Sequence, residues 1–177
     1  SLGITKVPAA DPTKVFRVNF IADLWSQVKM IRQDRVLWLA VLGNTFFFAI
    51  AALIQLLIVS YASDVLHISD PTMSSYLQAA TAIGIGLGSF AAGYLSGGKI
   101  EYGLVPLGAM GLTLFAALLG RTGTSFAEVA VELSLLGFFG GFFIVPVAAL
   151  LQHRPLPEKR GGVLAAANLI SFIGIFL

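Results

Sequence analysis

The sequence contains no cysteine and very little charge. The absence of cysteine excludes disulfide bonds, thiol catalysis and cysteine-ligated metal sites. Charged residues make up only 11% of the 177 residues, whereas a typical soluble domain carries ~25%. Too few charged side chains are therefore available to cover a water-facing surface. Hydrophobic residues make up 57% of the chain and the mean hydropathy is +0.89, so the composition predicts a membrane protein.

The hydrophobic residues are gathered in long stretches that contain no charged side chain. A helix needs ~20 apolar residues to cross the ~30 Å hydrocarbon layer of a bilayer. The first four stretches are close to or above this length, and a fifth continues to the last residue. We therefore predict an all-α, polytopic membrane protein whose last span is truncated. The predicted spans are residues 36–62, 72–97, 103–120, 127–151 and 162–177.

The positions of lysine and arginine predict the topology. Six of them precede the first span, one lies between the second and third spans, and three lie between the fourth and fifth. Arg121 alone falls in the opposite set of loops. Loops rich in lysine and arginine stay on the cytoplasmic side of a membrane. The N-terminus of the chain is therefore predicted to be cytoplasmic.

Residues 1–35 are predicted to be a cytoplasmic lead-in to the membrane bundle of residues 36–177. Apolar side chains recur at helical spacing within residues 20–34, and Trp25 lies beside them. The basic residues of this segment gather at its end nearest the membrane. We predict an amphipathic helix in the cytoplasmic interface, and the alternative is that the first span continues into water. The apolar positions are Phe20, Leu24, Val28 and Ile31.

Glycine and alanine are concentrated in the second predicted span. Gly84 with Gly88, and Gly93 with Gly97, form two small-xxx-small pairs. Such pairs let the backbones of neighbouring helices approach closely. The pattern predicts either static helix packing or a surface along which a helix slides during a transport cycle.

The fourth span contains Gly140 and Gly141 a little more than one turn before Pro146. Proline removes a backbone hydrogen bond and kinks a helix. This combination predicts a bend, which acts either as a gate or as a static kink.

Polar side chains at membrane depth are costly and are therefore candidates for function. Glu132 lies about one turn inside the membrane, where it either lines an outward-opening cavity or reaches the outer interface. For the uncharged candidates the alternative is hydrogen bonding between helices. Because no span contains lysine or arginine, we expect no salt bridge within the membrane bundle. The substrate-cavity candidates are Asn44, Gln55, Gln78, Glu132 and Asn168.

Catalysis, metal binding, cofactor binding and nucleic-acid binding find little support in the sequence. There is no Ser/His/Asp arrangement, metal-ligand cluster or phosphate-binding loop. His153 and Glu158 form H-x4-E, a near miss to the H-x4-D motif of glycerolipid acyltransferases, but two prolines interrupt it. The basic residues follow the inner face of the membrane rather than forming a nucleic-acid surface. We therefore expect a protein that is not an enzyme and has no cofactor.

Three segments resemble the lysophospholipid transporters of the major facilitator superfamily, including the form fused to an acyltransferase and an acyl-carrier-protein synthetase. The first and most specific is GGFFIVPVAALLQ at residues 140–152, which a basic loop and Gly161–Leu169 follow. The second, PTMSSYLQAATAIGIG at residues 71–86, is similar to the eighth helix of the family. The third, GYLSGGKIEYG at residues 93–103, resembles a degenerate form of the superfamily's loop motif between helices eight and nine.

This resemblance implies a fold, a location and a function. The spans would be helices seven to eleven of a twelve-helix transporter in the bacterial cytoplasmic (inner) membrane, with the N-terminal half missing. Helices seven, eight, ten and eleven of that fold line the substrate cavity. The implied activity is movement of lysophosphatidylethanolamine-like lipid to the inner leaflet by alternating access. Gln55 stands in helix seven, where family members carry a basic residue.

Two alternative functions are compatible with the sequence. The chain could belong to a major-facilitator exporter of drugs or other small amphiphiles. It could also be a membrane anchor for a fused or associated acyltransferase, without transport activity of its own. In every case the expected partners are membrane lipids.

Overall fold

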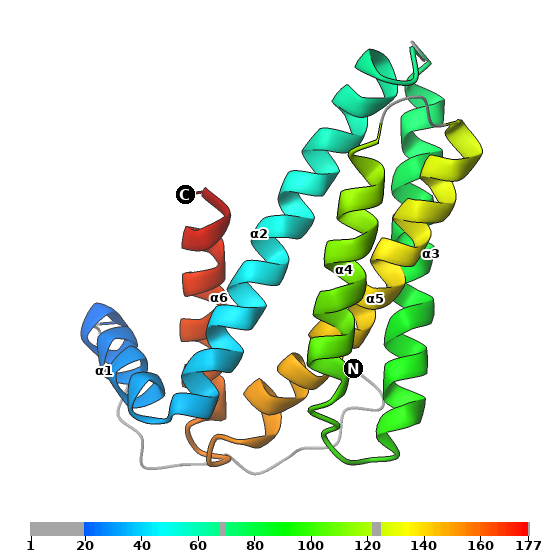
Figure 1. The fold of residues 1–177 in the computed structure, drawn as a ribbon. Coiled ribbons are helices and arrows are strands. Elements are labelled where there is room, and N and C mark those ends of the chain that lie inside the picture. The colour runs from blue at the N-terminus through cyan, green and yellow to red at the C-terminus, as the bar shows by residue number, and fades with distance from the viewer. Residues whose placement is uncertain (1–19, 68–69, 122–124, 177) are drawn as a thin grey trace, which may run out of the picture.

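The computed structural model describes residues 20–67, 70–121 and 125–176, which form six α-helices and no β-strand (Figure 1). The all-α prediction is therefore confirmed. Three of the helices, α2, α3 and α5, are long and apolar enough to cross a membrane, whereas α4 and α6 are shorter apolar helices. The bounds are α1 Phe20–Gln33, α2 Arg35–Asp64, α3 Pro71–Ser96, α4 Leu104–Leu119, α5 Phe126–His153 and α6 Arg160–Phe176.

Polar side chains fix where the long helices begin. Asp34 accepts hydrogen bonds from the backbone amides of Val36 and Leu37 and so caps α2. Asp70 caps α3 in the same way, directly before a proline in the first helical position. Ser125 and Glu128 form a reciprocal capping box at the start of α5. These caps satisfy backbone amides that have no partner within the helix.

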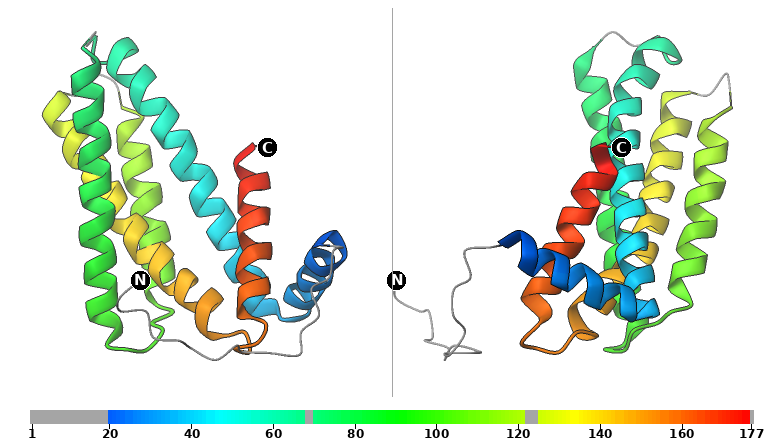
Figure 2. Two further views of the ribbon diagram at one scale, coloured as in Figure 1. Left: turned by 180° about the vertical axis from the view of Figure 1, so that it is seen from behind. Right: turned by 90° about the vertical axis from the view of Figure 1, so that its left-hand side faces the viewer.

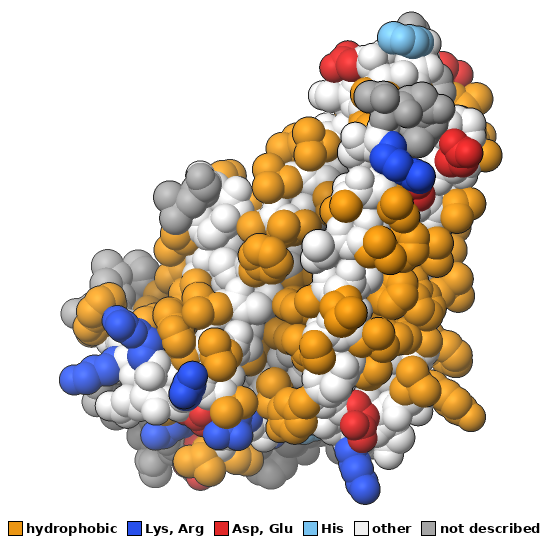
Figure 3. Space-filling view, in the orientation of Figure 1, with side chains coloured by type: hydrophobic (Ala, Val, Ile, Leu, Met, Phe, Trp, Pro, Cys, Tyr) orange, Lys and Arg blue, Asp and Glu red, His pale blue; other side chains and the backbone are white. Residues whose placement is uncertain are grey.

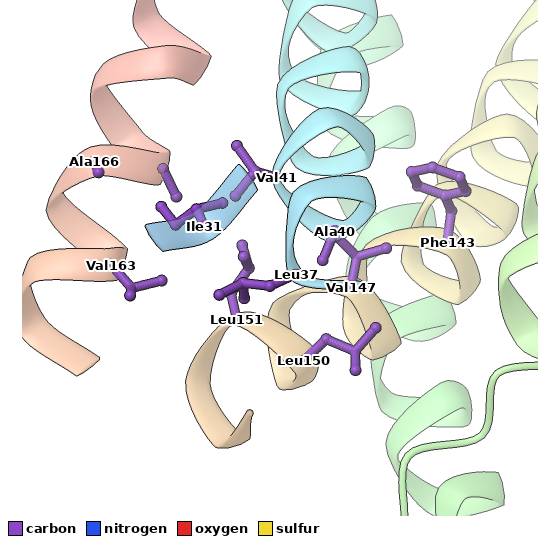
Figure 4. Close-up of a cluster of buried hydrophobic side chains, with 11 residues drawn as sticks. Ile31, Leu37, Ala40, Val41, Phe143, Val147, Leu150, Leu151, Val163 and Ala166 are labelled. Atoms are coloured by element: carbon purple, nitrogen blue, oxygen red, sulfur yellow. The ribbon is translucent and has the colours of Figure 1, made fainter. Parts of the chain in front are cut away.

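The helices form two groups that lie side by side (Figures 1 and 2). In one group, α3 and α4 both pack against α5, which runs diagonally across the bundle. In the other group, α6 and α1 pack against α2. A core of buried apolar side chains joins the two groups near the end of the bundle where α2 begins and α5 ends (Figure 4). Its labelled members include Ile31 of α1, Val41 of α2, Val147 of α5 and Val163 of α6.

Helix α1 is separate from α2 and runs in a different direction (Figure 2). Ile31 is fully buried against the core, whereas 71% of Trp25 is exposed. The Arg32 guanidinium lies 5.7 Å from the centre of the Trp38 ring, a cation–π contact that links the end of α1 to the start of α2. The interfacial position of α1 in a membrane stays a prediction.

Charged side chains gather at the two ends of the bundle, and hydrophobic side chains cover the flank between them (Figure 3). Lysine and arginine lie mostly at the end that holds the α3–α4 and α5–α6 connections, while Arg121 lies at the opposite end. This arrangement matches the separation of charge that the sequence predicts between the two sets of loops.

Candidate functional site

A cavity of about 320 Å³ lies where α2, α3, α4 and α5 meet. Among the predicted site residues, Gln55 of α2 and Gly140 of α5 line it. Most of the wall is aliphatic or aromatic, including Phe46, Phe47 and Phe143. The complete lining is Phe46, Phe47, Ile50, Ala51, Ile54, Gln55, Thr81, Ile85, Ala109, Leu112, Thr113, Ala116, Leu136, Gly137, Gly140 and Phe143.

The three polar side chains of this wall differ in what they can offer a ligand. The Thr81 hydroxyl donates to the carbonyl of Leu77 at 3.0 Å, and the Thr113 hydroxyl donates to the carbonyl of Ala109 at 2.9 Å. Both hydroxyls are therefore satisfied within their own helices. Gln55 makes no side-chain hydrogen bond to any described residue. The cavity thus combines an apolar wall with one amide that is free to bind a polar group.

One face of α2 lines the cavity, together with side chains of α5. Gln55 and Phe46 are nine residues apart, which places them at the two edges of that face at ~100° per residue. A second cavity of about 160 Å³ shares Ile54, Ala116 and Leu136 with the first and extends toward the ends of α2 and α4 at Tyr61 and Leu119. The two cavities therefore form one apolar track between α2 and α4, with α5 as its floor.

Four glycines let α3 and α5 approach closely beside this track. A Cβ atom on Gly84 or Gly88 would collide with the backbone of α5, and one on Gly137 or Gly141 would collide with the backbone of α3. Gly137 also lines the main cavity. Thr81 and Ile85 of α3 lie against Gly137 through their backbones and also line the cavity.

The second predicted glycine pair is not in such a contact among the described residues, and its role in packing or sliding stays a prediction. Within the part of the chain that the structure describes, a Cβ atom on Gly93 or Gly97 would meet nothing within 4 Å. Gly97 instead ends α3 with a left-handed backbone, φ +52°, a conformation that glycine adopts without a steric penalty. The sequence spacing of the two pairs is the same, and only the position of α5 distinguishes them.

The predicted bend in α5 involves three residues with different surroundings. Gly140 faces the cavity, where the ring of Phe47 lies 3.2 Å from the position of a Cβ atom, while Gly141 faces the backbone of α3. Pro146 is fully buried and lies within one helix that continues from Phe126 to His153. A gating role for these residues stays a prediction.

Asn44 is closed off from the cavity. It is buried, with 6% exposed, and its side-chain amide donates to the hydroxyl of Ser171 on α6 at 2.9 Å. The hydroxyl oxygens of Thr45 and Ser171 are 3.2 Å apart, and Thr45 also donates to the carbonyl of Val41. This polar cluster joins α2 to α6, which is the helix–helix alternative that the sequence left open for Asn44.

Glu132 forms a salt bridge, contrary to the expectation that the membrane bundle contains none. Arg121 reaches back from the end of α4, and its Nη2 lies 2.6 Å from Oε1 of Glu132 on α5. The Glu132 side chain is 9% exposed, and its Oε2 is buried without a hydrogen-bond partner among the described residues. The expectation failed because it considered only basic residues inside the spans, whereas the long arginine side chain enters from outside.

The two remaining polar candidates lie elsewhere. Gln78 lines a pocket of about 290 Å³ between α2 and α3, together with Ser63, Asp70 and Ser74. Asn168 is exposed on α6. The five predicted side chains are therefore not gathered into one site, and Gln55 is the member that lines the main cavity.

Sequence reasoning missed the aromatic wall of the cavity. Phe47 and Phe143 stack with ring centres 6.2 Å apart and an interplanar angle of 17°. A search for polar residues at membrane depth passes over such side chains. The run Phe46-Phe47-Phe48 in one predicted span and the glycines in another were the available signals, because aromatic rings need room that glycine can provide.

The end of the bundle opposite Arg121 holds a second ion pair. Arg154, which follows α5, donates from Nε to Oδ2 of Asp34 at 2.6 Å. This hydrogen bond, with those from the backbone amides of Leu37 and Val36, holds the pKa of Asp34 below its usual value. The same contact raises the pKa of Arg154. No group of three or more potential metal ligands occurs among the described residues.

Comparison with known proteins gives a consistent result over the whole chain. The family model of the Major Facilitator Superfamily matches residues 4–177. The lysophospholipid transporter LplT of Klebsiella pneumoniae subsp. pneumoniae is 29% identical over 180 residues, which cover 100% of this chain and 45% of the relative. The LplT of Cronobacter sakazakii is 32% identical over 174 residues, covering 96% of this chain and 43% of the relative.

The LplT of Escherichia fergusonii is 30% identical over 170 residues, covering 94% of this chain and 42% of the relative. The chain thus spans a little under half the length of the curated relatives that it matches. No solved structure matches the chain.

Proposed function

Because the chain belongs to the major facilitator superfamily, we propose that it is part of a transporter that moves lysophospholipid across a bacterial cytoplasmic membrane. The observation that supports this most strongly is the alignment of nearly the entire chain with lysophospholipid transporters. The five apolar helices agree with a multi-pass membrane protein.

The part of the transporter that we assign to this chain is its C-terminal half, with α2 to α6 as helices seven to eleven. Basic residues are concentrated at one end of the bundle. This supports a cytoplasmic position for that end, which carries Lys99 and Arg154. Transport would then proceed by alternating access, in which this half rocks against the other half around a site near the middle of the membrane.

The chemistry of the cavity suits a lipid with one polar head. Its apolar wall can contact a hydrocarbon chain, which forms no hydrogen bonds. The free Gln55 amide can donate a hydrogen bond to, or accept one from, an uncharged part of a head group. A head-group phosphate would find no arginine or lysine in this wall. We therefore propose that Gln55 contacts the head group without setting its charge preference.

The test uses the complete protein that contains this chain, reconstituted in lipid vesicles. We expect it to move labelled lysophosphatidylethanolamine between leaflets faster than empty vesicles do, and the isolated residues 1–177 to move none. Transport by the isolated chain would contradict the assignment of this chain to one half of the transporter.

Uptake measurements in cells that express the complete protein can distinguish the alternative functions. An exporter of amphiphilic drugs would change drug accumulation and leave lysophospholipid uptake unaltered. A membrane anchor would tolerate replacement of Asn44, Gln55 and Asn168 by leucine without loss of lipid uptake by the complete protein. Either result would contradict the proposed function.

The proposed orientation has a direct test, because residues 1–177 contain no cysteine. Single cysteines at Arg154 and Asp64 can be labelled separately with a reagent that does not cross the membrane. We expect labelling of the Asp64 position from outside intact cells and of the Arg154 position only after the membrane is opened. Labelling of both positions from the same side would contradict the topology.

A further inference from the structure

We propose that three side chains on one face of α1 bind the head group of an anionic phospholipid in the cytoplasmic leaflet of the membrane. The three residues are Trp25, Lys29 and Arg32, and we call them the α1 stripe. The lipid bound there belongs to the bilayer and is not transported, so this inference goes beyond the proposed function.

The apolar side of α1 is covered by the protein itself. Ile31 is fully buried, and Leu24 and Val28 pack partly buried against the same core, to which α2, α5 and α6 also contribute. An amphipathic helix at an interface usually rests its apolar side on the bilayer, whereas α2 and α6 pack against that side of α1. A different side of α1 is therefore available to the membrane.

The α1 stripe lies on one exposed face of the helix. Lys29 follows Trp25 by four residues and Arg32 follows Lys29 by three, a spacing that places side chains above one another. All three residues are exposed, and Trp25 has 71% of its surface exposed. Tryptophan is enriched at membrane–water interfaces, and basic side chains beside it attract anionic lipids. The composition of the stripe therefore suits the head-group layer.

The contact between Arg32 and α2 indicates that this face points toward the membrane. The Arg32 guanidinium lies 5.7 Å from the centre of the Trp38 ring, in the first turn of the apolar helix α2. Both views of Figure 2 place α1 level with the lower half of α6, and its N-terminal end lies higher than the end that joins α2. Trp25 therefore lies deeper than Arg32, in the order in which a phospholipid presents its acyl chains and its phosphate.

The two cations of the stripe lack a negative partner in the described part of the chain. Neither Lys29 nor Arg32 forms a salt bridge there, and Arg32 donates no hydrogen bond to a described residue. Asp34, the next carboxylate along the chain, already binds Arg154. The guanidinium group is well suited to binding two phosphate oxygens at once. An anionic head group supplies the missing negative charge.

The first experiment measures contact between Trp25 and lipid in the complete protein, reconstituted in nanodiscs. The nanodiscs contain phosphatidylglycerol and phosphatidylcholine in equal amounts, and the acyl chains of one of the two lipids are brominated to quench fluorescence. The difference in emission between the unmodified protein and Trp25→Phe isolates Trp25. We expect stronger quenching by brominated phosphatidylglycerol, with an excess that shrinks as salt screens the charges. Equal quenching by the two lipids, or none by either, would overturn the proposal.

The second experiment removes one charge from the stripe or one from elsewhere at the same end of the bundle. Lys29→Gln changes the stripe, and Lys99→Gln is the matched control, because Lys99 is also exposed and lies in the α3–α4 connection. We expect Lys29→Gln to lower the preference of Trp25 for phosphatidylglycerol about fivefold, the effect of one basic residue near an anionic surface. Lys99→Gln should leave the preference unchanged. Equal effects of the two variants would refute a site at the stripe.

A soluble head group distinguishes a lipid site from a site for free phosphate. We expect glycerol phosphate to change the quenching no more than sodium chloride does at the same ionic strength. Displacement of the brominated lipid by glycerol phosphate beyond this salt effect would count against a site for membrane lipid.

This inference and the proposed function fail separately, because none of the quenching measurements requires transport. A complete protein that moves no lysophospholipid would refute the proposed function and leave the lipid site standing. If lysophospholipid is moved but Trp25 shows no preference for phosphatidylglycerol, the lipid site alone fails.

Discussion

Arg154 and Asp34 are 120 residues apart in sequence, yet the Nε of Arg154 donates a 2.6 Å hydrogen bond to Oδ2 of Asp34. Asp34 also caps α2 through the amides of Val36 and Leu37. One carboxylate therefore starts the longest helix and ties it to the end of α5. This ion pair, the α3–α5 contact at Gly88, the Arg121–Glu132 pair and the Asn44–Ser171 hydrogen bond can each be tested by substitution.

The two roles of Asp34 can be separated by substitution. Asp34→Asn retains a good helix cap but loses the ion pair, so we expect it to lower stability by up to about 1 kcal/mol. Asp34→Ala loses both contacts and should cost about 1 kcal/mol more. Thermal unfolding of the complete protein in detergent measures the difference. Arg154→Gln is the control, because it should match Asp34→Asn.

The depressed pKa of Asp34 makes its contribution depend on pH. A carboxyl group whose pKa is lower in the folded than in the unfolded state stabilises the fold above its unfolded pKa of ~3.9. This stabilisation is lost as the pH falls through the lower folded pKa. We expect the stability difference between the unmodified protein and Asp34→Asn to be constant from pH 7 to about pH 5 and to shrink below pH 4. A difference that grows on acidification would contradict this.

Gly88 and Gly86 lie two residues apart on α3 but differ in what a methyl group would meet. Gly88→Ala would drive a Cβ atom into the backbone of Phe138 on α5, so we expect a loss of about 1–3 kcal/mol from overpacking. Gly86→Ala meets nothing within 4 Å and should leave stability unchanged or raise it by up to about 1 kcal/mol through helix propensity. Equal unfolding midpoints for the two variants would count against the close α3–α5 contact.

For the Arg121–Glu132 pair, we expect a double substitution to lower stability less than substitution of Arg121 alone. Arg121→Gln leaves the buried Glu132 carboxylate without its cation, which should cost about 1–3 kcal/mol. The double variant Arg121→Gln with Glu132→Gln removes the buried charge and should recover most of that loss. Unfolding of both variants in detergent at neutral pH is the measurement. A double variant that is less stable than Arg121→Gln would refute this account.

The Asn44–Ser171 hydrogen bond predicts energetic coupling between α2 and α6. In a double-mutant cycle with alanine at both positions, we expect a coupling energy of about 0.6 kcal/mol, as for hydrogen bonds between membrane helices. A cycle that pairs Asn44 with the exposed Asn168 serves as control and should show no coupling. Coupling of the same size in both cycles would mean that the hydrogen bond is not its source.

Much of the membrane architecture can be predicted from residue order alone. An apolar stretch must become a helix in lipid, because every backbone polar group there needs a partner within the protein. Asp70 before Pro71, and Ser125 before Glu128, are short-range patterns that cap α3 and α5 in the structure. The positions of lysine and arginine likewise divide the loops between helices into two sets, one for each side of the membrane. This prediction does not depend on which helices contact one another.

The contacts between helices depend on the tertiary structure. Equal spacing made Gly84 with Gly88 and Gly93 with Gly97 equivalent in sequence, yet α5 lies against the first pair alone among the described residues. Asn44 and Gln55 are both polar residues of one apolar helix, but α6 covers Asn44 while Gln55 borders the cavity. Sequence patterns report the side of a helix on which a residue lies. The packing of segments that are distant in the sequence decides what that side meets, because hydrogen bonds, steric contact and burial act over a few ångströms in space and not along the chain.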